Sequence, residues 1–321
     1  MDTDYLIERR TLKKRITFWR ILAFLVAVGA LIGGGLYMGG GTELERHQAH
    51  IARLKISGII TGDQATLDTL KNIGESSAKA VFLVIDSPGG TVTGSEALFE
   101  AIRNVAAKKP TIAIVDGLAA SGGYIAALGA DRIIARRTSV VGSIGVLFQY
   151  PDVVKLLDSW GVKVESIKSA PLKASPNPVE PTSPEARAAI AAVVESNFNW
   201  FKELVKERRN LTNEEVQTVS DGRIFAGEQA LPLKLIDEIG SEKQALSWLA
   251  KEKGIDETTR VIDWKIKLQD NLFRLSDAMA LGARLAGFET LALSIDQAAQ
   301  AQKKLSLDGV LVLWHPSLDI Q

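Results

Sequence analysis

Two glycine-rich motifs hold the residue types that could do chemistry, and each falls where a predicted strand is followed by a predicted helix. They are DSPGG at 86–90 and AASGGY at 119–124. In the second motif, the small neighbours of Ser121 would let a substrate backbone approach closely. Its hydroxyl would lie at the start of a helix, where backbone N–H groups are free. Ser121 is therefore either a nucleophile or only a helix N-cap.

The paired glycines of the first motif, Gly89 and Gly90, would leave backbone N–H groups free to point into a cleft. Such groups stabilise an anion, either a phosphate or the oxyanion of acyl transfer. The sequence has neither the P-loop pattern nor the G-x-G-x-x-G pattern, which weakens the phosphate alternative. The alternative is that the paired glycines serve only to form a tight turn, which requires glycine.

The sequence offers neither a histidine nor a cysteine in the predicted core that could act as the base for Ser121. The chain has 3 histidines and no cysteine, and His47, His50 and His315 all lie outside residues 51–314. This distribution disfavours a Ser-His-Asp triad in the core, and it also disfavours thiolate chemistry and a histidine- or cysteine-based metal site. Lysine is therefore the leading candidate for the base.

Lys168 and Lys173 follow the predicted strand at 162–167. A lysine acts as a base only when it is neutral, so burial would have to lower its pKa from about 10.4 to near 7. The alternative is that both are solvated surface lysines, which is the usual environment of this residue.

The charge balance disfavours one class of partner. Lys and Arg number 38 and Asp and Glu also number 38, which argues against a nucleic-acid-binding surface.

The elements that must position these motifs alternate between strands and helices. We predict strands at 51–60, 80–85, 111–115, 132–135 and 162–167, and helices at 64–72, 95–107, 124–130, 153–160 and 184–209. This alternation predicts an α/β fold with a largely parallel sheet. The DSPGG motif is expected to end its strand. Sites in such sheets form at the carboxyl ends of strands, where both motifs lie.

A basic segment at 1–20 precedes an uncharged segment at 21–41, which is long enough to cross a bilayer. The basic flank predicts a cytoplasmic N-terminus and places the rest of the chain outside. A cleaved signal peptide is the alternative. We divide the remainder into a linker at 42–50, a catalytic domain at 51–254 and a C-terminal extension at 255–321, which is expected to be mostly helical.

Four motifs fall in the order and spacing of the signal peptide peptidase A family: DSPGGTVTG at 86–94, AASGGYIA at 119–126, VGSIG at 141–145 and KSAPLK at 168–173. Over residues 51–252 the sequence resembles these membrane-bound S49 serine proteases, and its N-terminus resembles the anchor of the short bacterial form. The resemblance implies a ClpP/crotonase-like fold, a Ser-Lys dyad and a bacterial inner-membrane location with an extracytoplasmic catalytic domain.

The resemblance also implies a role for each matching residue. Ser121 would be the nucleophile and Lys173 the general base. The backbone N–H groups of Gly90 and Gly122 would form the oxyanion hole, and Ser143 would orient the lysine.

Two of these assignments have alternatives. Gly89 could replace Gly90 as the oxyanion donor. Lys168 could replace Lys173 as the base, because alanine and proline stand at 170–171 where the family's Ser-Gly-x-x-Lys pattern has a glycine.

The resemblance further implies peptide substrates, among them remnant signal peptides, and neither a metal nor a cofactor. It implies a dome-like homo-oligomer, commonly an octamer, whose sites are completed by neighbouring subunits. Two other classes remain open: a crotonase-type acyl-CoA enzyme, and a non-catalytic membrane scaffold of the same fold. The apolar segment at 305–321 could enter the active-site groove as a pseudo-substrate, be trimmed there, or dock on the domain.

Overall fold

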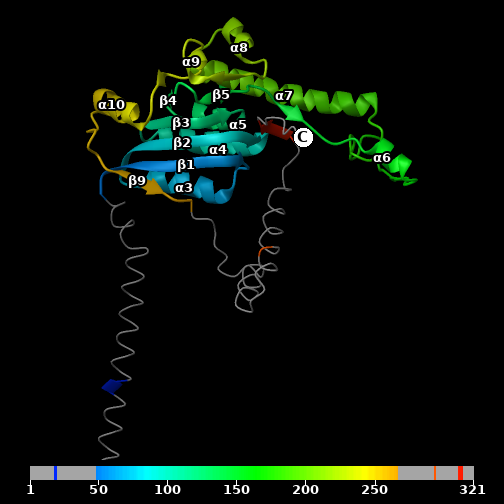
Figure 1. Ribbon diagram of the computed structural model, residues 1–321, viewed down its shortest axis with the longest axis horizontal. Helices are drawn as coiled ribbons and strands as arrows, with labels where there is room; N and C mark the ends of the chain where they lie inside the picture. Colours follow the sequence, from blue (N-terminus) through cyan, green and yellow to red (C-terminus); the bar gives the residue numbers. More distant parts are fainter. Residues whose placement is uncertain (1–17, 20–47, 267–292, 294–309, 314–321) are drawn as a thin grey trace, which may run out of the picture. The chain divides into compact units, whose positions relative to one another are not determined.

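The computed structural model describes residues 18–19, 48–266, 293 and 310–313 (Figure 1). The chain forms two units, Met1–Ala49 and His50–Gln321. The predicted membrane segment at 21–41 lies outside the described residues, as do most of the helices expected in the C-terminal extension. Within the described part, no helix is both long enough and apolar enough to span a bilayer.

The second unit is built on a largely parallel sheet, as predicted (Figure 1). Strands β1, β2, β3 and β4 pair in that order and all run parallel. Strand β9 extends the sheet beside β1, and β8 extends it beside β4. The bounds of these strands are β1 His50–Ile60, β2 Ala78–Thr91, β3 Thr111–Ala120, β4 Arg132–Ala135, β8 Glu238–Ile239 and β9 Val261–Trp264.

Helices cover both faces of this sheet. Apolar side chains alternate along β3, so that Ala113 and Val115 join one core cluster while Ile112 and Ile114 join the other. Strands buried on both faces are typical of parallel sheets. The first cluster contains side chains from α3, α4, α5 and α7, and the second contains side chains from α10. The helices are α3 Gln64–Glu75, α4 Val92–Ala106, α5 Gly122–Leu128, α6 Val154–Ser159, α7 Pro184–Arg209, α8 Asn213–Val219, α9 Gly227–Ala230 and α10 Glu242–Lys253.

Short strands extend the sheet near the two glycine motifs. Strand β5 runs parallel to the end of β3, and β7 pairs antiparallel with β5. Strand β10 lies antiparallel between β2 and β6. Their bounds are β5 Val140–Gly142, β6 Leu147–Phe148, β7 Ile224–Ala226 and β10 Val310–Leu313.

The prediction that DSPGG ends its strand was wrong. Strand β2 continues to Thr91, and Ile59 and Ile60 of β1 stay paired with Gly89 and Gly90. The register of β1 shifts between Ser57 and Ile59, so β1 follows the bend in β2 instead of separating from it. Glycine therefore bends this strand without ending it, because a neighbour continues to satisfy the backbone.

The predicted strand at 162–167 was also wrong, since residues 162–168 have no regular secondary structure. Val162 and Val164 are nearly half exposed, and Ile167 is fully exposed. An alternating sequence forms a strand only where another strand supplies hydrogen bonds. The two lysines of interest therefore lie in a long loop between α6 and α7.

Helix α7 begins and ends where the sequence predicts. The hydroxyl of Ser183 accepts a hydrogen bond from the backbone N–H of Ala186 at 3.1 Å, and Pro184 occupies the first turn. Phe201 and Val205 are fully buried in the C-terminal half, whereas Val193 in the N-terminal half is 43% exposed. Figure 1 shows the N-terminal half of α7 extending beyond the sheet toward α6.

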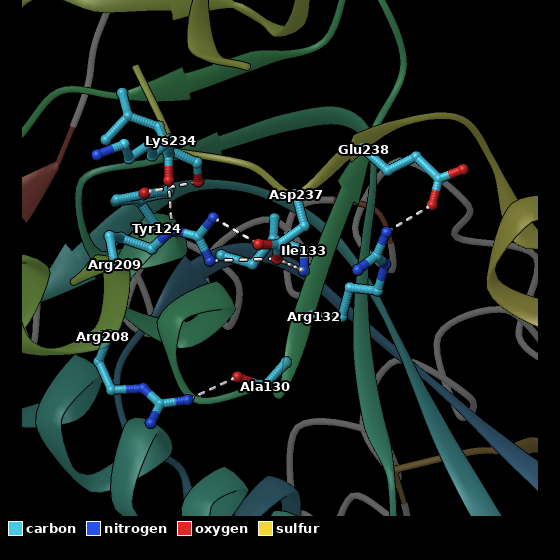
Figure 2. Close-up of polar contacts among 10 residues, drawn as sticks. Tyr124, Ala130, Arg132, Ile133, Arg208, Arg209, Lys234, Asp237 and Glu238 are labelled. Carbon is cyan, nitrogen blue, oxygen red and sulfur yellow. Dashed lines mark hydrogen bonds and ion pairs between the residues drawn. The ribbon is translucent and has the colours of Figure 1, made fainter. Parts of the chain in front are cut away.

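Two arginines attach the end of α7 to the sheet and to α5 (Figure 2). Arg208 donates to the carbonyl oxygens of Leu128 at 2.8 Å and Ala130 at 2.9 Å, at the end of α5. Arg209 donates two hydrogen bonds to the carboxylate of Asp237, at 2.8 and 3.1 Å. The helix that follows Ser121 is thereby joined to the helix that follows the lysine loop.

Candidate active site

Ser121 lies at the junction of β3 and α5 in an unusual backbone conformation. Its φ is 55° and its ψ is −117°, a region that costs a non-glycine residue about 1–3 kcal/mol. Its N–H donates to the carbonyl oxygen of Gly142 at 2.8 Å, and its own carbonyl accepts from Tyr124 at 2.9 Å. The Ser121 side chain makes no capping hydrogen bond, although the residue occupies the N-cap position. This leaves its hydroxyl available for chemistry.

Ser143 is brought to the same edge of the sheet. Because Ala120 pairs with Gly142 in the parallel β3–β5 ladder, Ser121 and Ser143 follow at matching positions. Ser143 also has a positive φ, of 51°, and its N–H donates to the carbonyl oxygen of Arg223 at 2.8 Å. The turn after β5 is thus held by the segment that leads into β7.

The two glycines of DSPGG differ in their hydrogen bonds. The N–H of Gly89 donates to the hydroxyl oxygen of Ser87 at 3.1 Å, so it already has an acceptor. Gly90 pairs with Ile60, and a Cβ on Gly90 would lie 1.8 Å from the Ile60 carbonyl oxygen. The Ser87 contact therefore disfavours Gly89 as an oxyanion donor, and the Ile60 contact explains why position 90 needs glycine.

Ser87 is a residue that the sequence analysis missed. It is fully buried, and its hydroxyl donates to the carbonyl oxygen of Gly58 at 2.7 Å while accepting from Gly89. It also pairs with Ala119 and so joins the two glycine motifs. The only signal in the sequence was a serine placed between a buried apolar run and paired glycines, where a buried hydroxyl needs a hydrogen-bond partner.

The first turn of α5 packs directly on this loop. A Cβ on Gly123 would lie 2.6 Å from the carbonyl oxygen of Ser87, so the glycine permits the close approach. Gly122 is the first residue of α5, where a backbone N–H has no acceptor within the helix. The sheet therefore brings together Ser121, Gly122, Ser143 and the DSPGG loop.

The two candidate lysines have different environments. Lys168 forms an ion pair with Glu180 and donates to the hydroxyl of Ser175 at 2.9 Å. The hydrogen bond from Lys168 is the main cause that lowers the pKa of Glu180 to about 2. Lys168 is thus engaged with an acid, whereas Lys173 lies exposed on a turn and has no side-chain partner among the described residues.

The structure does not join either lysine to Ser121. Within the described part of the chain, no hydrogen bond links Lys168 or Lys173 to that residue. The reason is that the loop carrying the lysines precedes the outer end of α7, while Ser121 lies at the edge of the sheet. One copy of the chain brings together every predicted site residue except the base.

A cavity of about 410 Å³ lies at the end of β1. Its lining includes Ile60, which pairs with Gly90, and Leu98 of α4. The other aliphatic residues that line it are Ile56, Ile59, Leu67 and Ile266. Polar side chains, among them Asp63 and Thr66, line the rest of it. Among the described residues, no cluster of His, Cys, Asp or Glu could hold a metal ion.

A buried serine in a constrained strand-to-helix turn, beside a glycine-containing segment of the neighbouring strand, is the arrangement expected of a serine hydrolase that works by acyl transfer. Comparison with known proteins identifies the family. Residues 103–256 match Peptidase family S49, and residues 62–143 match Clp protease. The chain belongs to peptidase family S49 and is a serine peptidase.

Several named proteins are similar to this chain. A "Putative protease" of Synechocystis sp. is 35% identical over 64% of this chain and 75% of its own length. A "Putative signal peptide peptidase SppA" of Enterococcus faecium is 34% identical over 67% of each chain. The chloroplastic "Serine protease SPPA" of Arabidopsis thaliana is 30% identical over 58% of this chain and 28% of its own. These similarities favour a peptidase over the acyl-CoA enzyme and the scaffold.

Proposed function

We propose that this chain is a membrane-anchored endopeptidase that uses Ser121 as its nucleophile and Lys173 of a neighbouring copy as its general base. The observation that carries the proposal is the conformation of Ser121, whose positive φ is maintained while its hydroxyl makes no capping bond. Strain of this kind persists where the surrounding structure imposes it, which is common at active sites.

The loop that carries Lys173 supports a base supplied by a second subunit. We call residues 154–183 the lysine arm. Its exposed apolar side chains are Leu156, Trp160, Val162, Val164, Ile167 and Leu172. Exposed apolar surface of this extent marks an interaction site. Docking of the arm on another copy would desolvate Lys173, and burial lowers the pKa of a lysine toward the range in which it is a base.

Lys173 is preferred to Lys168 because Glu180 already engages Lys168. An opposite charge within contact distance stabilises the protonated form of a lysine, which is the form that cannot accept a proton. The exposed Lys173 has no such competing contact among the described residues.

The mechanism then follows from the site. The neutral amine of Lys173 removes the proton of Ser121, and the resulting alkoxide attacks a peptide carbonyl. The N–H groups of Gly90 and Gly122 stabilise the tetrahedral oxyanion, and Ser143 orients the lysine. The ammonium of Lys173 protonates the leaving amine. Water, activated by the same lysine, hydrolyses the acyl-enzyme and frees Ser121.

The substrates of the proposed enzyme are apolar peptides at a membrane, among them remnant signal peptides. Three observations support this class: the uncharged segment at 21–41, the partly aliphatic cavity at the end of β1, and similarity to a protein named as a signal peptide peptidase. In the proposed orientation the N-terminus is in the cytoplasm of a bacterial cell, and the catalytic domain is on the outer side of the inner membrane.

Labelling with a fluorophosphonate tests the proposal in the detergent-solubilised full chain. We expect the wild-type chain to be labelled and Ser121→Ala to remain unlabelled. Lys173→Ala should reduce labelling by at least 100-fold, because the hydroxyl would lose its base. The matched variant Lys168→Ala should retain most of it. Strong labelling of Ser121→Ala, or unchanged labelling of Lys173→Ala, would contradict the proposal.

A further inference from the structure

The amino-terminal edge of the sheet carries a cluster of three lysines. Lys79 is the second residue of β2, and Lys108 and Lys109 lie in the turn that leads into β3. Because the N–H of Val81 donates to the carbonyl oxygen of Pro110 at 2.9 Å, this turn lies beside the start of β2. We call Lys79, Lys108 and Lys109 the edge lysines.

The positive charges of the edge lysines are close together. Lys109 donates to two backbone carbonyl oxygens at the end of α3, those of Ile73 at 2.9 Å and Ser76 at 2.5 Å. Burial lowers the pKa of Lys109, and the charges of Lys108 and Lys79 lower it further. The side chains of Lys79 and Lys108 are exposed, so the cluster presents its charge to whatever lies beyond this edge.

Acidic side chains do not neutralise this cluster. Among the described residues, no edge lysine forms an ion pair. The carboxylate of Asp131 accepts instead from the guanidinium of Arg103 at 3.3 Å and from the backbone N–H of Thr111 at 3.0 Å. Glu75, at the end of α3, is exposed and pairs with none of the three. Since the charge of the whole chain is balanced, the edge lysines are a local excess of positive charge that fits an anionic partner.

The same edge of the sheet receives the chain from the predicted membrane segment. His50 is the first residue of β1, and it pairs with Ala78, which directly precedes Lys79. Residues 42–50 are all that separate the uncharged segment at 21–41 from β1. A chain of this length spans at most about 30 Å. If the uncharged segment crosses a bilayer, its linker is therefore short enough for the edge lysines to reach the lipid headgroups.

We propose that the edge lysines form a docking surface for an anionic lipid bilayer. Docking would hold the amino-terminal edge of the sheet against the headgroups, whereas Ser121, which follows the last residue of β3, lies at the opposite edge. The negative potential of anionic lipids attracts lysines near the membrane surface and falls off within a Debye length of about 10 Å. The inference rests on the membrane anchor of the proposed function and goes beyond the peptidase chemistry.

The first experiment measures the reactivity of each lysine with the full chain in lipid nanodiscs. One set of discs contains phosphatidylcholine alone, and the other contains phosphatidylcholine mixed with phosphatidylglycerol. A neutral reagent acylates exposed amines, and mass spectrometry of the digested chain gives the rate at each lysine. We expect Lys79 and Lys108 to react several-fold more slowly in the anionic discs and to recover at high salt.

Lys243 is the control for this measurement, because it is exposed near the start of α10 and lies outside the cluster. It should react equally in both kinds of disc. Equal rates for Lys79 and Lys108 in the two kinds of disc would overturn the proposal. Inorganic phosphate added to the phosphatidylcholine discs should leave their rates unchanged. If phosphate protects them as well as the anionic discs do, the site binds free anions and the assignment to a membrane is overturned.

The second experiment reverses the charge of the cluster. Lys79→Glu/Lys108→Glu is compared with Lys55→Glu/Lys243→Glu, which makes the same change in net charge at exposed positions elsewhere. The readout is the ratio of the Lys109 acylation rates in the two kinds of disc. Lipid dependence of this ratio should disappear in the first variant and persist in the second. The same ratio in both variants would overturn the proposal.

These outcomes separate the docking surface from the proposed function. If the chain does not stay with the discs, the anchor is rejected and the docking surface with it. If the chain stays and Ser121 is labelled by the fluorophosphonate, but the lysine rates do not depend on the lipid, only the docking surface is rejected. If the edge lysines are protected while Ser121 is not labelled, the docking surface stands and the assignment of the nucleophile fails.

Discussion

Ser121 has a conformation that the sequence alone could not reveal. A positive φ combined with a ψ of −117° is disfavoured for any residue with a Cβ, yet the chain keeps serine there between alanine and glycine. The bond from its N–H to Gly142 and the start of α5 fix the backbone on both sides. We infer that this strain is retained because the position requires a hydroxyl.

Replacing Ser121 by glycine tests this inference. Ser121→Gly should raise the free energy of unfolding by about 1 kcal/mol, since glycine adopts this conformation without strain, while peptide hydrolysis is lost. Urea denaturation followed by circular dichroism measures the first effect, and an assay of an aliphatic peptide measures the second. If Ser121→Gly is less stable than Ser121→Ala, the backbone at this position is not strained.

We expect Ser87 to affect the chemistry through the DSPGG segment. Its hydroxyl satisfies both the Gly58 carbonyl and the Gly89 N–H. Ser87→Ala should cost about 1–3 kcal/mol of stability, because it leaves two buried backbone groups unpaired. It should also lower kcat more than it raises KM, because Gly90 would no longer be held in place.

Ser95→Ala is the matched control for that prediction. Ser95 is also fully buried, and its hydroxyl donates to the carbonyl oxygen of Thr91 at 2.8 Å, but it makes no contact with the Gly89 N–H. Its loss should affect stability with little change in kcat. If the fall in kcat, relative to the fall in the free energy of unfolding, is the same for both variants, Ser87 has no positioning role.

At the scale of the elements, α7 connects the lysine arm to the nucleophile helix. Tyr124 of α5 donates to the carbonyl oxygen of Leu235 at 2.7 Å, close to the Arg209–Asp237 pair (Figure 2). Asp237 also accepts from the N–H of Ile133 at 2.7 Å. One carboxylate thus joins the C-terminal end of α7 to β4.

Breaking this pair should destabilise the whole unit. Arg209→Leu would leave the partly buried carboxylate of Asp237 without its charged partner, at a cost of about 2–4 kcal/mol. Arg137→Leu removes the exposed pair with Glu228 and should cost less than about 1 kcal/mol. Urea denaturation of both variants makes the comparison, and equal losses would contradict the buried role of Arg209.

Much of this arrangement could be predicted from the sequence. The buried strands show as continuous apolar runs, and α7 shows through its Ser183–Pro184 start and its apolar stripe. The continuation of β2 through DSPGG could not be predicted, because it depends on the register of β1. The alternating residues at 162–167 were misleading, since their pattern says nothing about whether a pairing strand exists.

The candidate site was predictable to a similar extent. The glycine motifs predicted that Ser121 and Gly90 lie toward the carboxyl ends of neighbouring strands, and the structure has Ser121 directly after β3 and Gly90 within the last residues of β2. The hydrogen bonds of Ser87 depend on Gly58, which is 29 residues away, and no local pattern indicates them. The separation of Lys173 from Ser121 depends on the direction of α7, which is a tertiary property.

At the scale of the whole molecule, one chain provides a candidate nucleophile, candidate oxyanion donors and a paired C-terminal strand. Its Lys173, however, lies in the loop between α6 and α7 and makes no hydrogen bond with Ser121. We propose one common explanation for the exposed apolar side chains of the lysine arm and for the absence of a base beside Ser121, which is that copies of the chain complete each other's sites. Such an arrangement would account for the exposure of Lys173, which lies in the segment at 168–173 that resembles the family motif.

Mixing two inactive variants tests this central claim most directly. Ser121→Ala and Lys173→Ala chains are produced separately and together, and fluorophosphonate labelling of the Lys173→Ala chain is measured in each preparation. The account predicts that labelling is negligible for either variant alone and is restored when they are produced together, since one chain supplies the hydroxyl and the other the amine. Labelling that stays negligible in the mixed oligomer would contradict it.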